Sequence, residues 1–292
     1  MSTVSIGLNI SPAVRVDMDP VGVAARAEEL GFDFVSVNDH LTGVGPRLET
    51  WTLLAWIAAS TSRLRVATRV LGVPYRNPAV TAKMAETLDR LSGGRLVLGL
   101  GAGASEAEFN AFGLGTATLP DRLQGLEEAI LITRGLWTGE PFSLAGSHYM
   151  TDAAILEPAP AHPIPIWLGT HGRRGLALTG RLADGWIPSL ELAPPDQVGL
   201  MRQSVLAAAA AAGRDPDAIT MVYSLVVSVG LPSADPFVVS GGTDAVAERL
   251  TRLLRLGFSG LNLILADPPE AEAEQLERLG GEVLPAVRAL AA

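Results

Sequence analysis

The chain has 292 residues, a formal net charge of −9, 48% hydrophobic residues and no cysteine. This length can bury a full core, the lack of cysteine excludes disulfides and thiol chemistry, and the acidic balance without a basic stripe argues against a nucleic-acid partner. Because we see neither an apolar run near the ~18 residues of a membrane helix nor a signal-peptide pattern, we expect a cytoplasmic protein that does not enter the membrane.

The first half of the chain alternates apolar runs of strand length with helical patterns. Strands are predicted over residues 4–10, 32–38, 64–71 and 96–100, and helices over about 20–30, 50–59, 78–92 and 123–136. The fourth run has no polar alternation, which is typical of a strand buried on both faces in a parallel sheet. Residues 141–150 resemble a hairpin.

The second half keeps the same order. Strands are predicted over residues 165–169, 185–188, 219–230 and 260–265, and helices over 175–182, 195–212, 243–256 and 270–291. Eight strand–helix units without a break in composition predict a (β/α)₈ TIM barrel forming a single domain over residues 1–292. A doubly wound sheet is the alternative, although it usually needs fewer units and a clear switch point.

In such a barrel the active site lies at the carboxyl ends of the strands. This rule selects Asp39 and His40 after the second strand and Arg69 and Val70 at the end of the third. His40 is one of only four histidines and follows a carboxylate. From this pair alone, a proton-transfer role and a hydrogen-bonded cap of a loop remain equally open.

Glycines stand at every second position where the fourth strand should end, at Gly99, Gly101 and Gly103. Without a Cβ, a backbone here can approach a flat ring or a phosphate closely, with Ala102 between the last two glycines. A glycine-rich strand packed against its neighbour accounts for the pattern equally well. The stretch lacks the third glycine of a dinucleotide-binding GxGxxG motif.

The segment Thr170, His171, Gly172, Arg173 and Arg174 precedes a predicted helix. Free backbone N–H groups at a helix start, together with two arginines, make a suitable anion site. Two solvated arginines on a first helical turn are the alternative interpretation.

Glu106 and Glu108 follow the glycines and are candidates for an acid/base pair. Acidic residues here more often begin a helix and complement its dipole, and we favour that interpretation for Glu108. No metal-ligand motif and no GxSxG nucleophile motif occurs, so we expect no metal site.

Taken together, these motifs resemble the bacterial-luciferase-like oxidoreductases and, within them, the branch that depends on the deazaflavin coenzyme F420. The resemblance runs nearly end to end and keeps the order of the motifs. The matching segments are residues 27–33, 39–40, 61–64, 76–78, 88–96, 99–103, 165–169, 183–186 and 248–250, with Glu106 and Glu108.

The resemblance implies a barrel that holds a flavin or deazaflavin at its carboxyl mouth. The ring would lie near Asp39, His40 and the end of the third strand, where the family often has a non-proline cis peptide, here between Arg69 and Val70. The phosphate-bearing tail would follow residues 101–103 and 170–174, which the residues themselves suggest as anion sites. Arg76 is a further candidate donor to the tail.

The implied activity is hydride transfer between C5 of F420 and an organic substrate. Several F420 enzymes have a glutamate as proton donor directly after the glycines, where this chain has Ala104. His40 is therefore our leading candidate for the acid, with the Glu106 carboxylate as a second candidate. An FMN-dependent monooxygenase using O₂ and a catalytically silent flavin-binding barrel are the alternatives.

Two further features are expected. The loop over residues 231–242 looks short for the family, which often has a substrate-covering insertion there, so an open pocket for a bulky substrate would follow. A homodimer through the helices around residues 51–59 and 79–91 is also expected.

Overall fold

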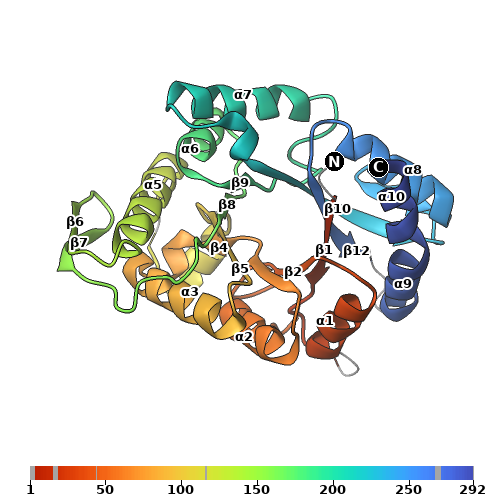
Figure 1. The fold of residues 1–292 in the computed structure, drawn as a ribbon, viewed down its shortest axis with the longest axis horizontal. Helices are drawn as coiled ribbons and strands as arrows, with labels where there is room; N and C mark the ends of the chain where they lie inside the picture. The colour runs from red at the N-terminus through yellow and green to blue at the C-terminus, as the bar shows by residue number, and fades with distance from the viewer. Residues whose placement is uncertain (1–3, 16–18, 44, 116, 267–270, 292) are drawn as a thin grey trace.

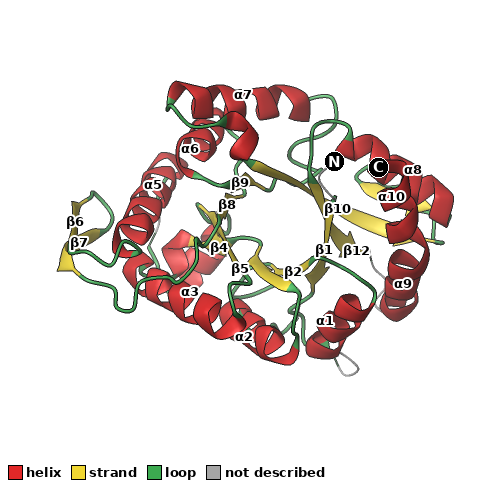
Figure 2. Ribbon diagram, viewed as in Figure 1, coloured by secondary structure: helices red, strands yellow, loops and turns green. Residues whose placement is uncertain are grey.

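The structure is a computed structural model, which describes residues 4–15, 19–43, 45–115, 117–266 and 271–291. Eight parallel strands close into a barrel, with helices in a ring outside it (Figures 1 and 2). In order around the barrel, the strands are β1 (Ser5–Ile10), β2 (Phe34–Val37), β3 (Arg65–Thr68), β5 (Leu96–Gly101), β8 (Ile166–Leu168), β9 (Gly185–Trp186), β10 (Thr220–Val229) and β12 (Gly260–Leu265). Because β12 pairs with β1, the barrel is closed, and the predicted (β/α)₈ fold is confirmed.

Local signals in the sequence explain where the helices begin and end. The described helices are α1 (Pro20–Glu29), α2 (Thr50–Ser60), α3 (Pro78–Ser92), α4 (Glu106–Ala111), α5 (Leu119–Leu136), α6 (Arg173–Leu182), α7 (Val198–Ala211), α8 (Thr243–Leu254), α9 (Glu272–Arg278) and α10 (Leu284–Ala291), with short 3₁₀ turns η1 (Val73–Tyr75) and η2 (Pro216–Ala218). In α3 the Asn77 side chain accepts hydrogen bonds from two first-turn N–H groups, and the helix ends at Gly93 with φ of 74°. These are an ordinary N-cap and a left-handed C-cap.

The third predicted strand, residues 64–71, is not one continuous strand. It is divided into β3 and β4 (Leu71–Gly72) at the peptide bond between Arg69 and Val70. That bond is cis, as the resemblance implies. Beyond the break, β4 continues alongside β5, with Leu71 opposite Leu100.

Three other elements differ from the prediction. A strand that the sequence pattern did not predict, β11 (Val238–Gly241), pairs in parallel with β10. The helix predicted to start at residue 123 begins at Leu119, because Thr118 and Asp121 form a capping box. The last helix, predicted over 270–291, is interrupted by a π-helical turn (Leu279–Val283), and residue 270 lies outside the described residues.

The hairpin is present as β6 (Phe142–Ala145) and β7 (Met150–Ala154), which extends past the predicted end. It projects beyond α5 on the outside of the barrel (Figure 1). No helix in the described ranges is long and apolar enough to cross a bilayer.

Apolar side chains fill the barrel interior below the carboxyl ends of the strands. Phe34 and Trp167 pack edge-on, with ring centroids 5.8 Å apart, inside a buried cluster. Val70 packs on this cluster and lines the mouth of the barrel. The barrel therefore gives the mouth a filled, apolar floor.

At the glycines in and just after β5, a side chain would clash with a neighbouring segment. A Cβ on Gly99 would lie 1.9 Å from the carbonyl oxygen of Thr68, and one on Gly101 would lie 2.6 Å from Cγ2 of Val70. Gly103 has φ of 76° and its Cβ would lie 2.6 Å from Cζ of Phe109. These contacts support the packing interpretation at Gly99 and place Gly101 directly beside Val70 at the mouth.

Candidate functional site

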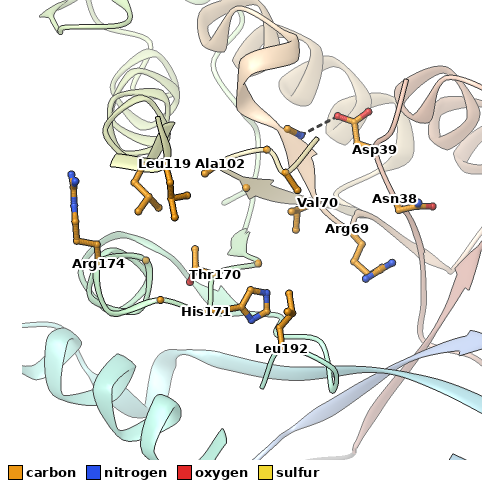
Figure 3. A pocket seen from close by; sticks show the side chains of 18 of the residues that line it. Asn38, Asp39, Arg69, Val70, Ala102, Leu119, Thr170, His171, Arg174 and Leu192 are labelled. Carbon is orange, nitrogen blue, oxygen red and sulfur yellow. Dashed lines mark hydrogen bonds between the residues drawn. The ribbon is translucent and has the colours of Figure 1, made fainter. Parts of the chain in front are cut away.

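A cavity of about 610 Å³ opens at the carboxyl ends of the strands (Figure 3). Its walls come from the ends of β2, β3, β5 and β8 and from the first turns of α5 and α6. The lining residues are Asn38, Asp39, His40, Arg69, Val70, Gly72, Tyr75, Gly101, Ala102, Gly103, Ala104, Leu119, Pro120, Leu123, Gly169, Thr170, His171, Gly172, Arg173, Arg174, Gly175 and Leu192. The location is the one expected for the active site of such a barrel.

The structure brings nearly all the sequence-predicted site residues together. Those that line the cavity are Asp39, His40, Arg69, Val70, Gly101, Ala102, Gly103, Thr170, His171, Gly172, Arg173 and Arg174. Glu106 does not line it: the side chain is 79% exposed, and its charged neighbour is Arg122, 3.9 Å away. Ala104 does line the cavity, at the position where the resemblance to F420 enzymes suggests a glutamate.

The Asp39 carboxylate is already bonded within the protein. It accepts a 3.0 Å hydrogen bond from the Gly72 N–H, drawn in Figure 3, and two bonds of 2.7 and 3.0 Å from the Arg76 guanidinium. Arg76 also pairs with Glu49. Arg76, considered above as a donor to a cofactor tail, is therefore paired with two carboxylates, and it does not line the cavity.

His40 is held by the carboxylate of Glu108, a residue that we interpreted from the sequence only as part of a helix start. Nδ1 of His40 lies 3.3 Å from Oε1 of Glu108, which is 3% exposed. The Tyr75 hydroxyl donates to the other carboxylate oxygen, and the N–H of Thr42 donates to Oε1 at 3.3 Å. Glu108 does lie in the first turn of α4, but it also contacts Nδ1 of His40, which our interpretation missed. Glu108 lies beside Phe109 on the buried side of this short helix. A charged residue at a buried helical position was the signal in the sequence that could have pointed to this role.

The surroundings of Glu108 keep it ionised and keep Tyr75 protonated. Burial raises the pKa of the Glu108 carboxyl, but the hydrogen bonds from Tyr75 and Thr42 and the nearby His40 outweigh it, so the pKa is below its ordinary value. Burial and the neighbouring Glu108 carboxylate raise the pKa of the Tyr75 phenol well above its usual range. Glu108 is thus a fixed acceptor, and Nε2 of His40 is left for a ligand in the cavity.

The turn before α6 presents unpaired donors to the cavity. Gly172 is the N-cap residue without a side-chain cap, and a Cβ there would meet nothing within 4 Å. Nδ1 of His171 is buried without a hydrogen-bond partner in the described part of the chain, and burial lowers the pKa of this imidazole. The Thr170 hydroxyl, in contrast, is bonded to that of Thr179 at 2.7 Å. An anion at the helix start would meet N–H groups, His171 and two arginines.

The cavity has an apolar side and two polar ends. Leu119, Pro120 and Leu123 from α5 and Leu192 supply apolar walls. Figure 3 shows Arg174 beside Leu119 at one end, and Asn38 and Arg69 at the other. A cavity of this shape, with donors at the α6 end and Val70 on its floor, fits a flat ring with a phosphate-bearing tail. Among the residues that the structure describes, no three His, Asp or Glu residues lie close enough to hold a metal.

Comparison with known proteins agrees with this geometry. Residues 19–252 match the model of the family described as luciferase-like monooxygenase. An F420-dependent glucose-6-phosphate dehydrogenase of Beutenbergia cavernae is 30% identical over 97% of this chain and 97% of its own length. One of Microbacterium testaceum is 29% identical, over 90% of this chain and 91% of its own.

Among solved structures, an F420-dependent secondary alcohol dehydrogenase in complex with an F420-acetone adduct superposes with a TM-score of 0.88. It is 21% identical and covers 98% of this chain and 99% of its own, so it supports the fold alone. The family model spans most of the chain, and the first of these relatives spans nearly all of it. The chain therefore belongs to the luciferase-like monooxygenase family.

Proposed function

We propose that the protein is an F420-dependent oxidoreductase that transfers a hydride between C5 of the deazaflavin and an organic substrate. The observation that carries the proposal is the main cavity, with a fixed His40–Glu108 pair in its wall and an uncapped helix start with two arginines at one end. The names of the full-length relatives, which are F420-dependent dehydrogenases, support the choice of cofactor.

Different residues of the chain would bind the ring and the tail of the cofactor. The ring would rest against Val70, with the backbone of Gly101, Ala102 and Gly103 along one edge. Arg173, Arg174 and the free N–H groups of α6 would bind the phosphate of the tail. Because F420 carries a phospholactyl and polyglutamate tail, it brings more negative charge to these arginines than FMN does.

His40 would move the proton that accompanies the hydride. With Nδ1 held by Glu108, Nε2 takes a proton from a substrate hydroxyl or, when protonated, gives one to a carbonyl oxygen. Glu108 acts through His40 and is a positioning residue. Since Glu106 lies outside the cavity, we assign it no part in the proton transfer.

Turnover distinguishes this function from its alternatives. We expect the protein to reduce F420 with members of a panel of secondary alcohols, or to oxidise reduced F420 with the matching ketones, without oxygen. Turnover only with reduced FMN and O₂ would favour a monooxygenase. If the protein binds F420 but turns over no member of the panel, the silent barrel, consistent with Ala104, is favoured instead.

We also propose that the chain is a single-domain homodimer that associates through α2 and α3. Three large apolar side chains on these helices are exposed: Trp56 at 68%, Val80 at 56% and Leu91 at 81%. Exposed apolar side chains on adjacent helices are typical of a protein–protein contact.

A further inference from the structure

A second, smaller cavity adjoins the main one on the side away from α6. Its volume is about 220 Å³, and it shares Asn38 and Arg69 with the main cavity. Besides these two, its lining residues include Asn9, Arg15, Arg47 and Glu272. Three arginines and a single carboxylate among the described lining residues make it strongly cationic.

Arg47 lies in this wall, and no carboxylate among the described residues pairs with its guanidinium. The loops after β1 and β2 meet in an antiparallel bridge between Ala13 and Arg47, with hydrogen bonds of 2.8 Å from Val14 to Pro46 and from Leu48 to Pro12. The backbone of Arg47 is therefore fixed. Its Nε and Nη1 atoms are buried and have no hydrogen-bond partner in the described ranges. A buried, unsatisfied guanidinium is costly unless a ligand completes it.

Within the described part of the chain, Arg69 is bonded to neutral groups. Its Nε donates to Oδ1 of Asn9 at 3.0 Å, and Nη1 lies 3.4 Å from the Ser224 hydroxyl. No carboxylate pairs with it among the described residues, and burial lowers the pKa of this guanidinium to about 10. Arg15, in contrast, is neutralised by Glu272 at 2.7 Å. Two arginines without a carboxylate partner among the described residues therefore line one small cavity.

We propose that this second cavity binds the carboxylate or phosphate group of the substrate, which makes the preferred substrates organic anions. The inference rests on the proposed function, since it places the substrate beside the ring site. Arg47 and Arg69 supply paired N–H donors suited to a planar carboxylate or a phosphate. The shared residues Asn38 and Arg69 connect this subsite to the main cavity, which allows one substrate to reach both.

The cofactor tail is the other possible source of such an anion. It has its own donors at the opposite end of the main cavity, where Figure 3 shows Arg174 away from Arg69. The test therefore removes the α6 arginines first. In an Arg173→Gln/Arg174→Gln background, phosphate binding reports on the second cavity without the contribution of α6.

The binding experiment is isothermal titration with sodium phosphate at constant ionic strength, without cofactor. In this background we expect Arg47→Gln to weaken phosphate binding by about tenfold or more, and Arg47→Lys to weaken it less. The matched control is Arg252→Gln, an exposed arginine on α8, which should change nothing. The absence of phosphate binding, or binding that Arg47→Gln leaves unchanged, would overturn the proposal.

A kinetic experiment links the subsite to the substrate. With F420 present, we compare 2-butanol with 3-hydroxybutanoate, which differ mainly by the carboxylate. The anion should have the higher kcat/KM, and Arg47→Gln should raise its KM by about tenfold with little change in kcat. The same substitution should leave 2-butanol unchanged, and equal effects on both probes would overturn the proposal.

The two experiments separate this inference from the proposed function. If F420 does not bind but Arg47→Gln abolishes phosphate binding, the cofactor assignment fails and the anion site stands. If F420 binds normally but Arg47→Gln leaves phosphate binding unchanged, only the proposed anion site is refuted. If neither 2-butanol nor 3-hydroxybutanoate is turned over, the phosphate titration alone tests the proposed anion site.

Discussion

Nδ1 of His40 lies 3.3 Å from Oε1 of the buried Glu108. His40 is therefore held by a carboxylate that is distant in the sequence. Its sequence neighbour Asp39 is bonded to Arg76 and Gly72 instead. The loop after β2 therefore contains two separate carboxylate contacts. One fixes the loop, and the other fixes the imidazole at the cavity wall.

Replacement of His40 tests the proton-transfer role. We expect His40→Ala to lower kcat by roughly 10²–10⁴-fold, because a positioned acid or base contributes about that much. His148→Ala, at an exposed histidine of the hairpin loop, is the matched control and should keep normal kcat. A His40→Ala enzyme with near-normal kcat and only a raised KM would assign His40 to binding.

Replacement of Glu108 tests its ionised state. Its folded-state pKa lies below the ordinary 4.5, so its contribution to stability is full above that value and is lost as the pH falls through the folded pKa. Glu108→Gln should therefore lower the free energy of unfolding by about 1–3 kcal/mol at neutral pH. The difference between the two proteins should shrink below about pH 4.

Urea unfolding of both proteins across this pH range is the measurement. A difference that stays constant from pH 7 down to pH 3 would show that ionisation of Glu108 contributes nothing to stability.

The barrel and the mouth of the site were predictable because both follow from periodicity along the chain. Apolar runs alternating with helices fix the strand order, and the strand ends then place residues such as Thr170 and Gly101 at one edge. The split of the third strand at Arg69 and the extra strand β11 were not predictable from periodicity, because they depend on which neighbour each segment pairs with.

The finer parts of the site depend on contacts between distant residues. Glu108 looks like any acidic residue in a first helical turn until Tyr75 and Thr42 are packed against it. Arg76 looks like a free cation until Asp39 and Glu49 pair with it. A single sequence contains no periodic signal for such pairings.

The close approach of β3 to β5 gives a test of the barrel mouth. Gly99→Ala should lower the free energy of unfolding by about 3 kcal/mol, because the new Cβ would lie 1.9 Å from a backbone carbonyl that cannot rotate away. Gly172→Ala, in open space at the same cavity, should change stability by no more than about 1 kcal/mol. Thermal and urea unfolding of both variants measures this, and equal losses would refute the packing explanation.

The proposed dimer is tested at Trp56. We expect Trp56→Asp to shift the protein from dimer to monomer in analytical ultracentrifugation, because a charge would be buried at the contact. Leu200→Asp is the matched control, since Leu200 is 69% exposed on α7, away from α2 and α3. A wild-type monomer, or a Trp56→Asp dimer as stable as wild type, would exclude this interface.

The cofactor is tested most directly by titrating the purified apoprotein with F420 and with FMN at low and at high salt. Well-formed contacts of Arg173 and Arg174 with the extra charges of the F420 tail would favour F420 over FMN by ~10²-fold. Because solvent screens these exposed arginines, we expect F420 to bind at least about tenfold more tightly than FMN. The preference should fall at high salt and in the Arg173→Gln/Arg174→Gln variant. FMN binding as tight as F420, with no salt-dependent difference between them, would contradict the F420 assignment and favour a flavin-dependent monooxygenase.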